Sequence, residues 1–346
     1  MTIITILYFI LILGVIVFVH EFGHFIFAKK AGIYVYEFSL GMGPRIFKFK
    51  RKNDETVYAI RVLPIGGFVQ LAGEDPELDK DIPKEKRLQS KTWMQRFLTM
   101  VAGVTMNFIL AIVILFIIAL VNGVSLDTRY VTEVDKTVYT NLVDGDKIIK
   151  VNGRKTNNYD KLALEIAASK NYEFDMVVVS KDNVKKTVHV KAKKTKDENK
   201  NEVYDFGFKL TGHKKKGILV SLQYAFLKFF TTIEQMIFTL IYLFTGRLSL
   251  KMLSGPVGLY SVVGQAASNG FLNILSLIAL FSINVGFINI LPFPAFDGGW
   301  VMFLVIEKIK GSPVKEKTQA IINAIGFYLL MLLMLYITFN DILKFF

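Results

Sequence analysis

Two histidines and a glutamate stand close together near the amino terminus: His20, Glu21 and His24. On a helix, residues four positions apart share a face, so both imidazoles can reach one cation. The glutamate beside them can act as a general base on a water at that cation, whose charge lowers the pKa of the water and polarises a nearby carbonyl. This short motif therefore predicts a zinc-dependent hydrolytic site with Glu21 as its base.

Other potential metal ligands are scarce in the chain. It has four histidines in all, the other two being His189 and His213, and no cysteine. Disulfides and thiolate zinc sites are therefore excluded, and any metal must be held by His, Asp or Glu. We interpret His189 and His213 as ordinary surface residues, because both fall in a polar, lysine-rich segment.

Asp297 is the best candidate for the third protein ligand that a catalytic zinc takes in addition to water. It is the only carboxylate between Asn269 and Glu307, and it directly follows a long apolar run. The alternative is that Asp297 only caps or turns the chain after a broken helix.

The residues around Asp297 predict a helix break inside the membrane. The string Asn289-Ile290-Leu291-Pro292-Phe293-Pro294-Ala295-Phe296-Asp297-Gly298-Gly299 holds two prolines and two glycines. Pro292, Pro294 and Gly298 disfavour a continuous helix and free backbone groups, which a membrane tolerates where the backbone lines a cavity. We therefore expect an irregular segment next to the metal.

Long apolar runs predict the elements that must position these residues. The chain is 52% hydrophobic, and its uncharged runs are Ile3–Val19, Phe97–Val121, Phe271–Phe296 and Ala320–Phe339. Each run is close to the roughly 20 residues that a helix needs to cross a bilayer. We therefore predict a mainly α-helical polytopic membrane protein with about four transmembrane helices: one within 1–30, one at 97–122, and two within 271–346.

The formal net charge of +13 invites comparison with nucleic-acid-binding proteins. However, Lys and Arg flank the apolar runs and decorate a polar domain, and no aromatic–basic stacking pattern emerges. We expect a lipid bilayer and no nucleic acid as partner.

The position of the His20–His24 motif argues against chance. It lies at the end of an uncharged span, where three polar groups cost on the order of several kcal/mol unless they are paired or ligated. The alternative is a helix end that has emerged into water. Lys29 and Lys30 follow the motif and no Lys or Arg precedes it, so the positive-inside tendency places the amino terminus outside and the site toward the cytoplasmic side.

The segment 31–96 changes to alternating residues around turns at Gly41–Pro44 and Asn53-Asp54, with Pro64–Gly67 closing the unit. This pattern predicts a membrane-associated β-hairpin on the cytoplasmic side, followed by a charged loop. An open edge of the hairpin could take an extended substrate as an added strand; the alternative is a hairpin that only plugs the cytoplasmic mouth.

Two further regions separate the second span from the third. Residues 123–213 alternate short strands with turns and one helix, which predicts an inserted α+β domain outside the cell. Residues 214–270 are apolar but interrupted by Gln223, Lys228, Glu234 and Gln235. We favour amphipathic surface helices there over a fifth span, because a fifth span would put the two halves of the site on opposite sides of the bilayer.

The two motifs, their order and the module between them resemble the site-2 protease family of intramembrane zinc metalloproteases, and within it the bacterial regulator-of-sigma-E protease group. Gly66-Gly67-Phe68-Val69 and Ser254-Gly255-Pro256-Val257-Gly258 support the resemblance. The resemblance implies Zn²⁺ as cofactor, with His20, His24 and Asp297 as its ligands and Glu21 as catalytic residue. It also implies substrate positioning by Asn289 and Asn107. The string Gly145–Gly153 resembles part of a PDZ domain.

The resemblance further implies a bacterial cytoplasmic membrane protein that performs regulated intramembrane proteolysis. Its substrates would be single-span membrane proteins, such as anti-sigma factors or remnant signal peptides, after an upstream site-1 protease has removed their outer part. Two alternatives remain. One is a non-catalytic scaffold or chaperone that retains the fold, and the other is a metal transporter, which would place polar residues along a whole pathway rather than at one end.

Overall fold

The computed structural model describes residues 3–74, 78–196, 202–249 and 255–343. It divides into two compact units: one formed by Met1–Ile114 and Leu253–Phe346, and one formed by Leu115–Met252. Each unit is considered by itself.

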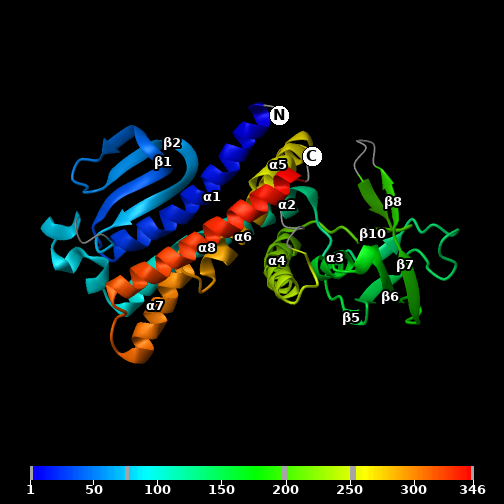
Figure 1. Ribbon diagram of the computed structural model, residues 1–346. Coiled ribbons are helices and arrows are strands. Elements are labelled where there is room, and N and C mark those ends of the chain that lie inside the picture. The colour runs from blue at the N-terminus through cyan, green and yellow to red at the C-terminus, as the bar shows by residue number, and fades with distance from the viewer. Residues whose placement is uncertain (1–2, 75–77, 197–201, 250–254, 344–346) are drawn as a thin grey trace. The chain divides into compact units, whose positions relative to one another are not determined.

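The first unit is a group of long apolar helices (Figure 1). They are α1 (Ile3–Lys30), α2 (Trp93–Asn122, which continues into the second unit), α5 (Pro256–Ser268), α6 (Phe271–Ile290), α7 (Asp297–Lys310) and α8 (Glu316–Leu343). Both α5 and α6 pack against α1. The chain between α6 and α7 is non-helical, and α7 ends where Gly311 takes the left-handed conformation that favours glycine.

A sheet made from two long, bent strands, β1 (Val35–Lys50) and β2 (Val57–Leu71), covers part of α1 (Figure 1). It is more elaborate than the single hairpin that we predict from the sequence. Residues 35–40 pair with 67–71, and 37–40 also pair with 57–60, while 45–50 pair with 57–61. The two strands therefore form four sheet segments, and within the described residues the segment 67–71 lies at an edge. Gly41 and Gly66 have positive φ angles at the bends, which is why the strands can fold back. Three short 3₁₀ helices, η1 (Leu78–Asp81), η2 (Lys84–Lys86) and η3 (Leu88–Ser90), follow the sheet.

The second unit contains a small α+β module and one long helix. The module has β3 (Tyr130–Thr132), β4 (Lys147–Val151), β5 (Arg154–Lys155), α3 (Tyr159–Ala167), η4 (Lys170–Tyr172), β6 (Glu173–Val179), β7 (Lys185–Lys191), β8 (Lys193–Lys196), β9 (Glu202–Asp205) and β10 (Lys209–Thr211). Its main sheet has the order β10-β3-β4-β6-β7, with β5 paired to β4, and β8-β9 is a separate hairpin. Leu142, Ile148, Leu162 and Met176 are fully buried in its core.

The long helix of this unit, α4 (Ile218–Phe244), is one of five described helices that are long and apolar enough to cross a membrane. The sequence predicts about four, and α4 accounts for the difference. Its mean hydropathy over the most apolar window is 1.3, against 2.1 to 3.0 for the other four. Length and composition therefore include α4 among the candidate spans but rank it last.

Polar side chains of α4 bind the module helix α3. Lys228 Nζ lies 2.5 Å from Asp160 Oδ1, and the Thr231 hydroxyl donates to Asp160 Oδ2 at 2.6 Å. One turn further, Glu234 accepts a 3.0 Å hydrogen bond from the Asn158 amide. At the far end, the Tyr242 hydroxyl donates to the buried carboxylate of Glu165, and Arg247 lies 3.6 Å from the same carboxylate. The two charged interruptions of the apolar run, Lys228 and Glu234, thus have partners within the unit.

Candidate metal centre

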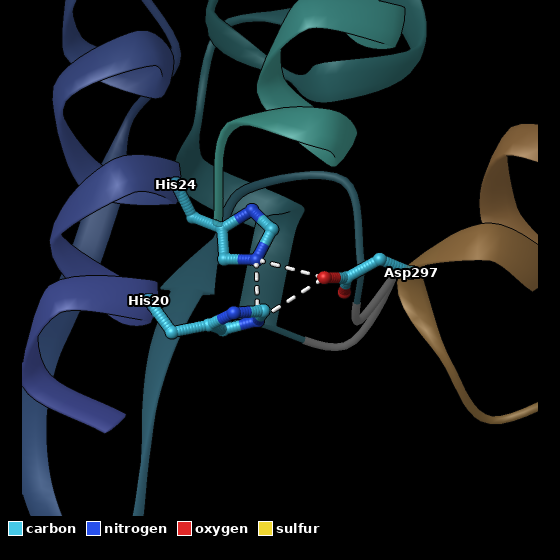
Figure 2. A group of neighbouring side chains, drawn as sticks. All are labelled: His20, His24 and Asp297. Carbon is cyan, nitrogen blue, oxygen red and sulfur yellow. Dashed lines mark hydrogen bonds and ion pairs between the residues drawn. The ribbon is translucent and has the colours of Figure 1, made fainter. Parts of the chain in front are cut away.

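His20 and His24 lie one turn apart on α1 and their rings meet edge to face, with centroids 4.9 Å apart. Figure 2 shows both rings turned to the same side of the helix. Their Nε2 atoms are 3.2 Å apart. The i, i+4 spacing on an unbroken helix produces this arrangement without help from other elements.

Asp297, the first residue of α7, completes the group from the other side (Figure 2). Its Oδ2 lies 3.1 Å from His20 Nε2 and 3.3 Å from His24 Nε2. Ligand atoms held tetrahedrally about 2.0–2.1 Å from a zinc ion are roughly 3.3 Å from one another. The three atoms therefore have the spacing and the chemistry of a zinc site that leaves one position open. Among the described residues this is the one group of three such side chains that could share a metal ion.

Hydrogen bonds on the far side of each imidazole fix its orientation. His24 Nδ1 lies 2.8 Å from the Thr99 carbonyl of α2, so Nδ1 carries the proton and Nε2 keeps its lone pair for a metal. His20 Nδ1 lies 3.3 Å from the side-chain amide of Asn107, which is fully buried. The amide nitrogen faces the ring, and the amide oxygen has no hydrogen-bond partner.

Rotating the Asn107 amide by half a turn resolves this mismatch. A ligating His20 must donate from Nδ1, and the rotated amide oxygen would accept that proton and find the partner it lacks. Nitrogen and oxygen of an amide are assigned from their hydrogen bonds. The surroundings of Asn107 therefore fit a metal-ligating His20.

Two glycines that the sequence reasoning did not single out let α1 and α2 come close enough. A Cβ on Gly103 would lie 2.4 Å from His24 Nε2 and 2.8 Å from His20 Nε2. A Cβ on Gly23 would lie 2.5 Å from the Ala102 carbonyl oxygen. Because Gly103 and Asn107 are four residues apart on α2, one face of that helix supports both imidazoles. That spacing was the signal available in the sequence.

Glu21, the predicted base, is a residue of α1, and its side chain lies against the edge of the sheet. The Val69 backbone hydrogen-bonds to its carboxylate. A Cβ on Gly67 would lie 3.3 Å from Glu21 Cγ, so the segment 67–71 runs directly beside this side chain. The edge of the sheet and the carboxylate thus share one neighbourhood.

The segment that carries Asp297 is tightly folded. A Cβ on Gly298 would lie 2.1 Å from the Leu291 carbonyl oxygen, so only glycine fits there. Pro292 and Pro294 fall in the non-helical stretch between α6 and α7, and Asn289 is half-buried in the last turn of α6. The two remaining histidines belong to the other unit. His189 lies beside Asp175 on the surface of the module, and His213 is exposed.

Comparison with known proteins assigns the chain to a family. The model of peptidase family M50 matches residues 8–333. The chain is 35% identical to the zinc metalloprotease RasP of Bacillus licheniformis and 34% identical to the regulator of sigma-W protease RasP of Bacillus subtilis, in both cases over 99% of each chain. It is 31% identical to the zinc metalloprotease RasP of Geobacillus kaustophilus, over 99% of this chain and 98% of the relative.

The chain therefore belongs to peptidase family M50, the site-2 proteases. It is a multi-pass membrane zinc metalloprotease, and Zn²⁺ is its cofactor. The resemblance drawn from the two motifs is confirmed at this level.

Proposed function

We propose that this metalloprotease cuts peptide bonds inside single-span transmembrane segments, with the zinc held by His20, His24 and Asp297. The observation that carries the proposal is the convergence of three lone-pair atoms, 3.1 to 3.3 Å apart, on one point between apolar helices. Ionisable groups between membrane helices cost free energy unless a cation or another partner compensates them.

Each residue has a defined task in this proposal. His20, His24 and Asp297 would hold the zinc, which would supply Lewis acidity to polarise the scissile carbonyl and to lower the pKa of the attacking water. Glu21 accepts a proton from that water on its carboxylate and returns it to the leaving amide nitrogen. The Val69 backbone holds the Glu21 side chain, and Asn107 and Thr99 hold the two imidazoles at their Nδ1 atoms.

Hydrolysis requires an extended substrate, because a helix hides its carbonyls in its own hydrogen bonds. The edge segment 67–71 runs beside Glu21, and an extended peptide can add to it as a further strand. Gly67 keeps this edge close to α1. Asn289 and Asn107 remain the residues that we expect to position substrate, and for Asn107 the contact to His20 adds a role in orienting a ligand.

The topology that we propose places the amino terminus outside, the active site toward the cytoplasmic side and α4 on the membrane surface. Lys29 and Lys30 close α1 on the inner side. The apolar face of α4, formed by Leu219, Phe226, Phe230, Ile237 and Phe244, is exposed and differs from the side on which Lys228 and Thr231 bind α3. A helix with one polar, docked face and one apolar face fits the interface of a bilayer better than its centre.

The physiological setting that we propose follows the relatives. One of them is named a regulator of sigma-W protease, which favours anti-sigma factors, or remnant signal peptides, as substrates in a bacterial cytoplasmic membrane. An upstream site-1 protease would first remove the outer part of the substrate. We interpret the α+β module as a PDZ-like domain outside the cell that binds or filters the trimmed substrate.

The test is purified Glu21→Gln protein with a single-span model substrate in liposomes. The matched control is Glu85→Gln, at an exposed position of η2. We expect Glu21→Gln to keep about one zinc per chain and to lose cleavage by at least roughly a thousandfold, because the general base is removed while the ligands stay. Cleavage near the wild-type rate would overturn the role of Glu21. A wild-type zinc content near zero would overturn the metal site and favour the scaffold.

A further inference from the structure

The turn before Asp297 is a strained one. Phe296 donates a backbone hydrogen bond to the Phe293 carbonyl, with Pro294 and Ala295 between them. Ala295 has a φ of 74°, the left-handed region that L-residues other than Asn and Asp rarely adopt. Proline second, a positive φ third and a bond from the first residue to the fourth are the marks of a type II turn, whose third position favours glycine. The chain has alanine there, so something must hold the turn.

Helix α8 contacts this turn at two points. The backbone N–H of Ala295 donates to the side-chain oxygen of Asn323 at 3.4 Å. Gly326, one turn further along α8 and buried, faces Pro294: a Cβ there would lie 2.5 Å from Pro294 Cβ and 2.8 Å from the Pro294 carbonyl oxygen. No side chain larger than hydrogen lets α8 approach the turn this closely.

Asn323 and Gly326 lie in an apolar stretch of α8. The side chains of α8 are mostly apolar and exposed, including Ile321, Ile325, Leu329 and Leu332. An amide in an apolar helix is retained at a cost unless it has a polar partner. For Asn323 that partner is the one backbone N–H which the turn leaves pointing outward.

The turn and Asp297 are separated by a single peptide bond after Phe296. Asp297 begins α7, and Gly298 and Gly299 pack against the carbonyl oxygens of Leu291 and Phe293. There is no flexible length of chain between the turn and the carboxylate. A shift of the turn is therefore passed on to Asp297, whereas His20 and His24 sit on a continuous helix that a shift of the turn does not move.

We propose that Asn323 and Gly326 are positioning residues that hold Asp297 in reach of the two histidines. The inference rests on the proposed role of Asp297 as zinc ligand. Asn323 holds the left-handed Ala295, Gly326 fixes the distance between α8 and Pro294, and together they place the carboxylate.

The test compares zinc affinity, by chelator competition, with the thermal unfolding of the metal-free protein in detergent. The variants are Asn323→Ala and Gly326→Ala. The controls are Asn340→Ala, a half-buried asparagine of α8 whose amide donates to the Tyr336 carbonyl of its own helix, and Gly14→Ala, a position in α1 with nothing within 4 Å. We expect zinc affinity to fall about fivefold for Asn323→Ala, the worth of one hydrogen bond, and at least about tenfold for Gly326→Ala. The controls should bind zinc like wild type, and Asn323→Ala should unfold like Asn340→Ala.

A rescue variant separates positioning from general damage. Glycine adopts a positive φ without strain, so Ala295→Gly added to Asn323→Ala should return most of the lost zinc affinity. Wild-type affinity in Asn323→Ala, or failure of Ala295→Gly to restore it, overturns the inference. If Asp297→Asn itself leaves zinc affinity unchanged, the ligand assignment fails instead, and the two failures are thus distinguished.

Discussion

The metal centre and the α3–α4 contact both hold ionisable side chains that are largely buried. They differ in how the charge of these side chains is compensated. At α3, opposite charges meet: Asp160 with Lys228 of α4, and Glu165 with Arg247, which follows α4 in the chain. In the metal centre, His20 and His24 turn nitrogen atoms with lone pairs toward each other and toward a carboxylate oxygen of Asp297. The first arrangement pairs opposite charges within the chain, and the second calls for a cation.

This difference separates a structural contact from a binding site. A buried charge without compensation costs several kcal/mol, so a chain keeps such a group only where a partner or a ligand offsets it. The α3–α4 contact contains its partners and therefore serves docking. The metal centre brings two imidazole nitrogens and a carboxylate oxygen to the spacing of metal ligands. The comparison yields predictions of decreasing size.

The largest effect is expected at Gly103, where no charge is changed. In Gly103→Ala the added Cβ would lie 2.4 Å from His24 Nε2 and 2.8 Å from His20 Nε2. Helix or rings must move, so we expect zinc affinity to fall by more than about a hundredfold, beyond the range for an indirect contact. Zinc stoichiometry after dialysis against a chelator measures it. The control is Gly264→Ala in α5, where the nearest atom would lie at an ordinary 3.5 Å. Full zinc retention in Gly103→Ala would show that the centre tolerates the displacement and that the geometry described here is not required.

A smaller effect is expected at Asn107, which supports His20 without touching the metal position. Asn107→Ala removes the acceptor for Nδ1–H and should weaken zinc binding by about 10–100-fold. Asn107→Asp keeps an acceptor of the same shape and should lose less, because a carboxylate also accepts from a ligating histidine. Equal losses in the two variants would contradict the rotated amide and leave Asn107 with its predicted role toward substrate alone.

The sequence was sufficient for the first half of the site and for most of the architecture. His20 and His24 are linked by helical spacing, and the apolar runs lie within α1, α2, α6 and α8, except that the third run extends six residues beyond α6. Asp297 was found by elimination, because carboxylates are rare in apolar segments. The approach of Asp297 to the histidines could not be derived, since it depends on the turn at 293–296 and on α8. Both are distant in sequence from His20 and His24.

Other features had weak signals. The four-segment sheet of β1 and β2 was predicted as one hairpin, because alternation reports which residues face the core but not which segments fold back on each other. Gly103 was passed over because a glycine in an apolar helix usually has no special role, and only the positions of the rings give it one. The hydropathy of α4 includes it among the candidate membrane spans. Its charged residues are explained by polar partners on α3, which the sequence does not reveal.

The smallest effect is expected at the α3–α4 contact, and it tests the other side of the comparison. Among the described residues, Lys228→Met leaves the buried Asp160 with only the Thr231 hydroxyl as side-chain donor. This should destabilise the contact by about 1–3 kcal/mol. Hydrogen exchange of the α3 amides should then speed up by about tenfold, whereas zinc affinity should not change.

Adding Asp160→Asn to Lys228→Met removes the unpaired charge as well, so protection of α3 should largely return, because a neutral amide left without an ion costs less than a buried carboxylate. Lys170→Met, at an exposed position of the same module, serves as control. Loss of zinc from Lys228→Met would break the distinction between the two regions, since it would make a charge pair of the second unit part of the metal centre. Unchanged exchange would show that α4 is held to α3 by its apolar contacts, and the argument for α4 on the membrane surface would lose its polar half.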